Sequence, residues 1–538
     1  MKNILIAIRS IFKKGRHNVM KIVSLGIGLA VGLVLIAKVY FEQSYDDFYP
    51  DRDRVYQVWA KYQQNGGELK DYPQTSGGIA PTMQQQIPEI ETVTRYTSFG
   101  DWTFTMTDTK MKYSGRCIIA DSCFFDILPR PMLIGNAKEV LSTPMYVLIS
   151  SRIAKNIGGD VIGKNFTVDN SPGRTMTIGG VFEEVPENSH SRYDVIVSMA
   201  SAGRFMWEGS PTNMLGNDRY ISYVKLHKGV NPLALEEQVR TFVNSYFPPE
   251  EQQKVGLSID FSFHKLDNLH KELPQVKRMT WILSLLAFAL IFTAVMNYIL
   301  IVISSIVNRS KEVAVHKCYG ASENNIHGMM FGEALVHIVL SLILALLLIL
   351  AFRGTVEELL ATSLDSLLLS NGSLVLLGIC ILVFFVSGFM PGSLYARIPV
   401  ASAFRNYREN KRIWKKALLL VQFVATGFLV TMLVFVARQY TFMVNDRPGY
   451  AYENLAYCGL AGVDSTSRAK ILDEVMRLPG VAAATTVYQL PFEHASGNNI
   501  LLPGGTQELF NIADLYWVGN GYLDMMEIPV IPGRSFTE

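Results

Sequence analysis

The sequence lacks the residue patterns that catalysis and metal binding require. Its five cysteines and nine histidines, spread over 538 residues, form no Cys-x-x-Cys pair and no His-Glu-x-x-His motif, and no Gly-x-Ser-x-Gly motif occurs. We therefore expect no catalytic, cofactor-binding or metal-binding residues and no enzymatic activity. Cys117 and Cys123 could form a disulfide, but the cysteine spacing shows no disulfide framework, which favours free thiols.

Charge is also scarce in this chain. Charged residues make up 18% of it and hydrophobic residues 49%, a composition that is hard to keep soluble. The formal net charge of +2 gives no reason to expect a nucleic-acid partner. The composition therefore points to membrane spans.

Five apolar segments are long enough to cross a membrane, for which a helix needs about 20 residues. A cleavable signal peptide is the alternative for the first, but some twenty residues precede its apolar core and no cleavage site follows, which favours a retained anchor. In it, Gly26, Gly28 and Gly32 should allow close helix packing, and Lys38 should snorkel to the surface. The predicted spans are residues 19–41, 280–307, 328–352, 372–396 and 417–438.

The distribution of basic residues predicts the orientation of these spans. Lys and Arg gather before the first span, in the loop 308–327 and in the linker 397–416, which should be cytoplasmic. Residues 42–279, the turn 353–371 and the tail 439–538 should lie outside. The N-terminus is then cytoplasmic.

Residues 1–18 are expected to form a cytoplasmic amphipathic helix. Ile4, Ile8, Ile11 and Phe12 share one face of it, and Arg9 lies on the other. Such a helix lies in the membrane interface and contacts lipid. Two roles fit the residues equally well, a simple topogenic anchor or a surface on which a cytoplasmic partner pushes.

The outer block 42–279 alternates strand-like and helix-like patterns and is large enough for a core of its own, so we expect an α+β domain. The predicted strands are 54–62, 92–98, 102–106, 174–181, 193–199, 220–226 and 257–266. The predicted helices are 79–86, 151–157 and 232–246. The block also contains four widely separated histidines that we interpret as structural or surface residues, namely His190, His227, His264 and His270.

One segment of the outer block imitates a phosphate-binding loop. Gly158, Gly163 and Lys164 have the required spacing, but Asn165 stands where a Ser or Thr should hold magnesium. We interpret this segment as a turn leading into a strand.

The chain partly repeats itself. In each half a basic stretch and a span precede a proline-containing turn, at Pro88 and at Pro479, and a short aromatic segment follows, at 124–127 and at 522–525. These ordered matches predict a duplication whose second outer domain, 439–538, is incomplete. We expect a full duplication to have eight spans.

The loop 308–327 carries the pattern Arg-x-x-Glu-Val-x-x-x-Lys-x-x-Gly-Ala, from Arg309 to Ala321. This pattern resembles that of the MacB/FtsX-like permeases of ABC transporters. Weaker matches lie at residues 7–12, 124–127, 179–186, 398–400 and 403–405. The duplicated form resembles the eight-span permeases of Bacteroidetes-type bacteria.

The resemblance implies a multi-pass α-helical membrane protein with α+β extracytoplasmic, MacB-like core domains, located in the bacterial inner membrane. It implies a dimeric ABC-type ATPase subunit as cytoplasmic partner, and it is compatible with a periplasmic adaptor or outer-membrane partner. The chain would export a peptide, antibiotic, lipoprotein or similar amphiphile. Alternatives are an FtsX-like regulator of a cell-wall hydrolase and, less well supported, a membrane enzyme with an outer active site.

The resemblance further implies that the loop 308–327 contacts the ATPase through a short helix. Val313, Val315 and Tyr319 would form an apolar wedge beside charged side chains, and Gly320 would end the helix. The basic residues could instead serve only to set the topology. The expected coupling residues are Arg309, Lys311, Glu312, Val315, His316, Lys317, Tyr319, Gly320, Ala321 and Ser322.

Polar residues within the predicted spans are few. Glu333 and His337 lie one helical turn apart in the third span and could pair. Ionisable residues inside a membrane are candidates for a functional site. Glu333 lies near the predicted cytoplasmic end of the span, however, so a position in the membrane interface fits it nearly as well.

Overall fold

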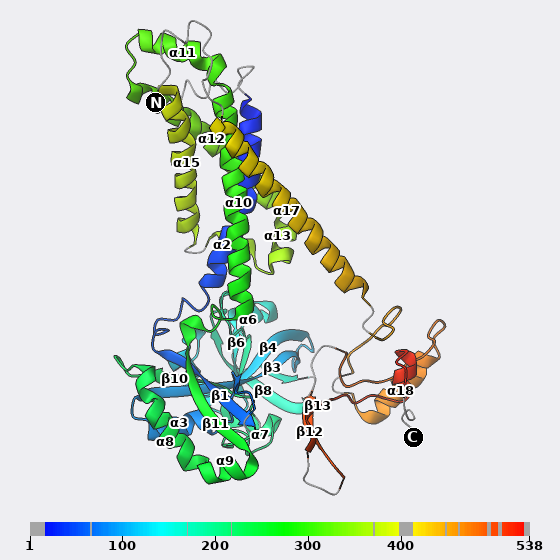
Figure 1. The fold of residues 1–538 in the computed structure, drawn as a ribbon. Helices are drawn as coiled ribbons and strands as arrows, with labels where there is room; N and C mark the ends of the chain where they lie inside the picture. The colour runs from blue at the N-terminus through cyan, green and yellow to red at the C-terminus, as the bar shows by residue number, and fades with distance from the viewer. Residues whose placement is uncertain are drawn as a thin grey trace. The chain divides into compact units, whose positions relative to one another are not determined.

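A computed structural model describes most of the chain (Figure 1). The described residues are 17–64, 67–168, 171–216, 218–369, 372–396, 413–446, 449–460, 463–491, 496–503 and 508–531. The chain divides into two compact units, Met1–Thr167 with Thr175–Gly427, and Val168–Arg174 with Phe428–Glu538. The predicted amphipathic helix, with Ile4, Ile8, Arg9, Ile11 and Phe12, lies outside the described residues, as does most of the linker 397–416.

Five helices among the described residues are long and apolar enough to cross a membrane. Each contains most of one predicted span and differs from it by a few residues at its ends. They are α2 (Asn18–Gln43), α10 (Pro274–Ser304), α12 (Glu323–Ala351), α15 (Ser373–Ala396) and α17 (Ile413–Asn445). Within the first unit, α2 packs against α10 and α12, and α15 packs against α12 and α10.

The glycines of α2 lie at close contacts with α10 and α12. A Cβ on Gly28 would lie 2.2 Å from Ala294 Cβ of α10, and a Cβ on Gly32 would lie 2.4 Å from Ile291. A Cβ on Gly26 would lie 2.9 Å from Leu344 of α12. The prediction that these glycines allow close helix packing is therefore confirmed.

The outer domain is built on a mixed sheet of eleven strands. Nine of them follow the order β11-β1-β10-β3-β4-β9-β6-β8-β5, while β2 pairs with β1, and β7 pairs with β3 and β8. The pairs β4–β9 and β6–β8 are parallel. The strands are β1 (Val55–Gln64), β2 (Lys70–Tyr72), β3 (Ile90–Met106), β4 (Lys112–Ala120), β5 (Met132–Ile134), β6 (Tyr146–Ser150), β7 (Asn165–Val168), β8 (Ser171–Phe182), β9 (Val195–Ser198), β10 (Ile221–Leu226) and β11 (Leu257–Lys265).

Strand β3 corrects the sequence interpretation. Segments 92–98 and 102–106 belong to one strand, which continues through a bulge between Ser98 and Gly100. Gly100 has a φ of 73°, a backbone conformation that glycine adopts readily. Strands β2, β4, β5 and β6 were not predicted. Strands β2 and β5 have only three residues each, β4 is polar at its start, and β6 is a short apolar run without alternation.

The outer domain also contains several short helices. The predicted helix 232–246 is divided into a 3₁₀ turn, η2 (Pro232–Leu235), and α8 (Glu236–Tyr246), and the polar α9 (Pro249–Val255) was not predicted. The others are α3 (Ile79–Gln86), α4 (Phe124–Ile127), α5 (Ala137–Ser142), α6 (Ser151–Ile157), α7 (Ala202–Phe205), η1 (Met199–Ser201) and η3 (Leu266–Asn268).

Two apolar clusters of described residues lie in the outer domain. Residues of α3 and α8, such as Met83 and Phe242, pack on β1, β10 and β11. Residues of α4 and α5, such as Phe124 and Leu141, pack on β4, β6 and β9. Together the clusters give the domain the core that its size predicted.

The second unit contains few regular elements among its described residues. Besides the end of α17, from Phe428 onward, they include α18 (Ser465–Met476), β12 (Ser496–Leu501), β13 (Glu508–Leu515) and α19 (Tyr522–Met525). Helix α19 has four residues, as has α4, and the two occupy matching positions in the predicted repeat. The duplication itself remains a prediction.

Candidate functional site

The loop 308–327 forms a separate helix, α11 (Ile306–Cys318), which follows α10 with only Ser305 between them. Val313 and Ala314 are buried in the apolar core of the membrane helices. Val315 is 44% exposed and Tyr319, just after the helix, is 89% exposed. The expectation that Val313 belongs to an exposed wedge is therefore wrong, because this side chain anchors α11 to the membrane helices.

The end of α11 is a tight corner leading into α12. Gly320 N–H donates to Lys317 O and Ala321 N–H donates to His316 O, each at 3.0 Å. Gly320 has a φ of 85°, which suits glycine at a helix end. Ser322 then caps α12 by accepting a hydrogen bond from Asn325 N–H.

The expected coupling residues thus lie on one helix and its C-terminal corner, and differ in exposure. Lys311 and His316 are exposed, whereas Glu312 and Lys317 are half-buried. Arg309 lies in α11 by its backbone. This arrangement presents an apolar side chain, Tyr319, beside basic ones.

The ionisable residues of α12 reach neighbouring helices. Glu333 lies 3.6 Å from Lys21 of α2, which is fully buried. His337 Nδ1 lies 3.1 Å from the hydroxyl of Tyr298 in α10. Polar contacts therefore join three membrane helices, while the pairing of Glu333 with His337 remains a prediction.

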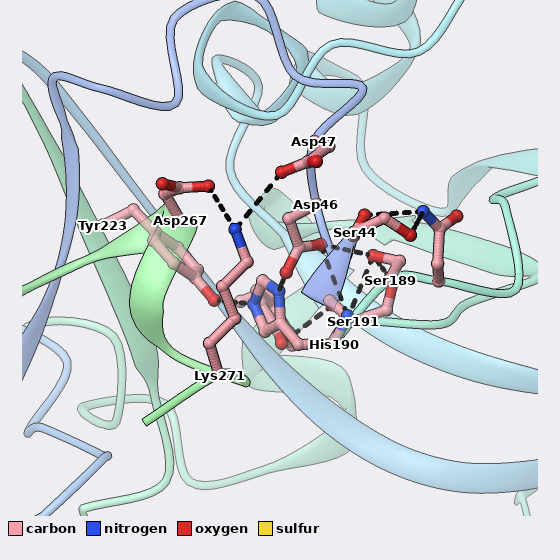
Figure 2. A network of polar contacts seen from close by, with 11 residues as sticks. Ser44, Asp46, Asp47, Ser189, His190, Ser191, Tyr223, Asp267 and Lys271 are labelled. Atoms are coloured by element: carbon pink, nitrogen blue, oxygen red, sulfur yellow. Dashed lines mark hydrogen bonds and ion pairs between the residues drawn. The ribbon is translucent and has the colours of Figure 1, made fainter. Parts of the chain in front are cut away.

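A second cluster of polar residues, which we call the outer junction, lies at the other end of α2 and α10. It comprises the turn 44–52 after α2, the loop 187–192 and the segment 266–273 before α10. Figure 2 shows how side chains from these segments converge. The junction joins the membrane helices to the outer domain.

Asp46 is at the centre of this junction and is fully buried. It has a φ of 60°, a left-handed conformation that Asp tolerates better than most residues. Its carboxylate accepts hydrogen bonds from Ser189 Oγ at 3.0 Å and from the His190 backbone N–H at 3.3 Å, and lies 2.7 Å from His190 Nδ1. His190 Nε2 in turn contacts the hydroxyl of Tyr223 in β10 (Figure 2).

The same loop completes the end of α2. The last carbonyl groups of a helix have no partner within the helix. Asn188 Nδ2 donates to Ser44 O at 2.7 Å, and Asp46 N–H donates to Asn188 O at 2.8 Å. The loop 187–192 is therefore hydrogen-bonded directly to the end of α2.

The segment before α10 contacts the end of α2. His270 Nε2 lies 2.6 Å from Glu42 Oε2, and the His270 ring stacks on Tyr45 with centroids 3.4 Å apart. Lys271 lies 2.9 Å from Asp267 and 3.4 Å from Asp47 (Figure 2). The two helices that enter the outer domain are thus joined by ionic and aromatic contacts.

Electrostatics at the junction favour charged carboxylates and neutral tyrosines. Burial tends to raise the pKa of Asp267, but the hydrogen bond from Lys271 and the positive charges of Lys271, Arg52 and Lys265 together outweigh burial, and the net shift is downward. Burial raises the pKa of Tyr45 and raises that of Tyr223 well above its usual value. The hydroxyl of Tyr223 therefore remains protonated beside His190.

The turn 353–371 also contributes to the outer end of the bundle. It contains α13 (Arg353–Leu360) and α14 (Leu364–Leu368), and Leu367 packs against Ala37 and Phe41 of α2. Ser363 N–H donates to Glu187 Oε2 of the outer domain at 3.0 Å.

Lys38 does not snorkel as we expected. It is 7% exposed, lies 2.7 Å from Glu42, and donates to Thr362 Oγ1 of the outer turn at 2.8 Å. The physical reason is that protein groups at hydrogen-bonding distance replace the solvent that a snorkelling lysine would seek.

Nothing in the described part of the chain resembles a metal centre, since it contains no group of three His, Cys, Asp or Glu side chains able to hold an ion. The segment from Gly158 to Lys164 is a turn leading into β7, as predicted. Sequence reasoning missed the outer junction. The signal was present in acidic residues directly after the first span and His270 directly before the second.

Two family models match the first unit, one over α2 and most of the outer domain and the other over the membrane helices that follow. The model of the MacB-like periplasmic core domain matches residues 20–242, and that of the FtsX-like permease C-terminal domain matches residues 284–400. No curated protein matches the chain.

Solved structures that are similar to part of the chain include the following three. A domain of a protein described as a permease, from Porphyromonas gingivalis, is 33% identical, with 40% of this chain and 91% of that chain covered and a TM-score of 0.38. The periplasmic region of MacB from Actinobacillus actinomycetemcomitans is 15% identical, with coverage of 41% and 92% and a TM-score of 0.28. The extracellular domain of the noncanonic ABC-type transporter YknZ from Gram-positive bacteria is 11% identical, with coverage of 38% and 98% and a TM-score of 0.27.

Proposed function

Because the chain belongs to the MacB/FtsX-like family of ABC transporter permeases, we propose that it converts ATP hydrolysis by a separate subunit into movement of its outer domain. Members of this family are generally non-catalytic membrane components that work with a cytoplasmic ABC ATPase. In this chain, α11 would be the surface that the ATPase dimer pushes. Its cargo would be a peptide, antibiotic, lipoprotein or similar amphiphile.

One observation carries this proposal. Helix α10 runs without a break from the outer junction to Ser304, and α11 begins two residues later. A displacement of α11 would therefore reach His270 and the outer domain through one continuous helix. Helix α2, held to α10 at Gly28 and Gly32 and to the loop 187–192 at its end, would move with it.

The proposal includes an orientation in the bacterial inner membrane. The N-terminus, α11 and the linker 397–416 would be cytoplasmic, where their basic residues satisfy the positive-inside rule. The outer domain would then be available to a periplasmic adaptor or outer-membrane partner.

Charge reversal on α11 tests the proposal. The full chain is co-expressed with a cognate ABC ATPase, and association and stimulated ATP hydrolysis are measured for Glu312→Arg with Lys317→Glu. We expect both to decrease. The matched control reverses two exposed charges of α9, Glu250→Arg with Lys254→Glu, and should behave like the wild type. Unchanged association and hydrolysis in the α11 variant would refute the coupling role.

A further assay separates transport from regulation. Efflux of an amphiphile that requires ATP hydrolysis would support transport. Activation of a cell-wall hydrolase without efflux would instead support the FtsX-like regulatory alternative.

A further inference from the structure

The outer half of α10 carries an exposed apolar stripe. Trp281, Leu285 and Phe288 are 78%, 62% and 67% exposed, and Phe288 stacks on Phe292 with ring centroids 5.9 Å apart. Their spacing of four, three and four residues places them on one face of the helix.

This face is exposed over only part of the helix. Val295 lies eighteen residues after Lys277, and Ile299 lies eighteen residues after Trp281. Eighteen residues make five full turns of the helix, so the two residues of each pair lie on the same face. Val295 and Ile299 are 5% and 0% exposed, because the membrane helices cover them. At 1.5 Å per residue, the stripe from Trp281 to the half-buried Phe292 is about 16 Å long. That length is about half of the ~30 Å hydrocarbon core, or one leaflet.

Two basic side chains lie at the outer end of this stripe. Lys277 and Arg278 are exposed, and within the described part of the structure neither makes an ion pair or a side-chain hydrogen bond. Lys277 lies one turn before Trp281, on the same face. These cations lie near the N-terminus of α10, where the helix macrodipole disfavours positive charge. On the outer side of a membrane, they also depart from the positive-inside rule. An anion that is not supplied by the described protein would offset both effects.

We propose that this face binds an outer-leaflet phospholipid with an anionic headgroup. The headgroup phosphate meets Lys277 and Arg278, and one acyl chain lies along Trp281, Leu285 and Phe288. A zwitterionic lipid would satisfy the apolar stripe, but its own positive group cancels the charge of its phosphate, so it would bring no net negative charge to the two cations, whereas an anionic headgroup brings one. The proposal rests on the orientation given under Proposed function, with the start of α10 on the outer side.

Trp281 is itself the reporter for a test. The full chain is reconstituted into phosphatidylcholine bilayers in which an equal mole fraction of either brominated phosphatidylglycerol or brominated phosphatidylcholine quenches tryptophan fluorescence. Because the chain has six tryptophans, the Trp281 signal is obtained by subtracting the Trp281→Phe variant. We expect phosphatidylglycerol to be preferred about five-fold, the factor that ~1 kcal/mol for one basic residue near an anionic surface represents.

Two variants make the result decisive. Lys277→Gln with Arg278→Gln should remove the preference while leaving quenching by phosphatidylcholine intact. Arg240→Gln with Lys254→Gln removes two exposed cations of the outer domain and should retain the preference. Equal quenching by both lipids in the wild type would overturn the proposal. So would absence of quenching, which would show that protein, such as a second copy of the chain, covers this face. No ATPase takes part in this assay, so its failure is distinct from failure of the coupling proposal.

Discussion

His270 Nε2 lies 2.6 Å from Glu42 Oε2, so the segment that enters α10 is held to the outer end of α2. The same carboxylate lies 2.7 Å from Lys38 through its other oxygen. One buried acid therefore connects two membrane helices and, through Lys38 and Thr362, the turn 353–371.

Replacing Glu42 with alanine should destabilise this region strongly. The change leaves the buried Lys38 ammonium without its carboxylate, and removing one partner of a buried ion pair costs about 3–5 kcal/mol. We expect lower thermal stability of the full chain in detergent and faster amide exchange at the end of α2. Glu251→Ala, on the exposed surface of α9, should change stability by less than about 0.5 kcal/mol. An equal effect of both variants would contradict the assigned role of Glu42.

Gly28→Ala should disturb the packing of α2 against α10. The added Cβ would lie 2.2 Å from Ala294 Cβ, and overpacking of this kind costs about 1–3 kcal/mol. Stability in detergent measures the effect. Gly378→Ala in α15 is the matched control, because nothing lies within 4 Å of its added Cβ and the better helix propensity of alanine should stabilise it. Tolerance of alanine at Gly28 would show that the two helices can separate without loss.

Tyr319→Ala should weaken association with the ATPase. The side chain is 89% exposed beside α11, and truncation of a central aromatic contact typically costs 2 kcal/mol or more, which is roughly a thirty-fold loss of affinity. Binding of the ATPase to the reconstituted chain measures it. Tyr457→Ala, in the second unit, removes a tyrosine that is 80% exposed and should leave binding unchanged.

Asp51 should make the stability of the outer domain dependent on pH. Its hydrogen bond with Lys225, at 2.6 Å, and its contact with Arg54 lower the pKa of this carboxyl. Because the pKa of Asp51 is lower in the folded than in the unfolded state, the stability that this carboxylate contributes is fully present above the unfolded pKa, about 3.9. This contribution is lost as the pH falls through the pKa of the folded state.

A thermal scan between pH 6 and pH 2 checks this expectation for Asp51. The difference in stability between the wild type and Asp51→Asn should be constant near neutral pH and should shrink below about pH 4. Asp53→Asn, two residues away and exposed, should show a smaller difference across the range. A constant difference down to pH 2 would contradict the assignment.

Thiol labelling tests the orientation of the spans. Cys318 at the end of α11 and Cys458 in the second unit are exposed, whereas Cys117 is buried, which raises its pKa. A membrane-impermeant maleimide added to intact spheroplasts should label Cys458 and not Cys318, and permeabilisation should add Cys318. Labelling of Cys318 before permeabilisation would reverse the proposed topology.

Much of the local structure could be predicted because it depends on neighbouring residues. Apolar runs of the required length predicted all five membrane helices, and Gly320 predicted a helix end, which the structure places after Cys318. Strand β3 was harder, since Gly100 within a bulge has the same local pattern as glycine in a turn.

The sequence by itself determined which segments are apolar enough to enter the membrane and where small residues allow helices to approach. Only the tertiary structure decided the outer junction. Glu42 and His270 are separated by more than two hundred residues, as are Lys38 and Thr362, so no periodicity in the chain relates them. The physical reason is that the partner of a buried charge is set by which segments the fold brings together, whereas hydrophobic length and helix ends depend on each residue's neighbours.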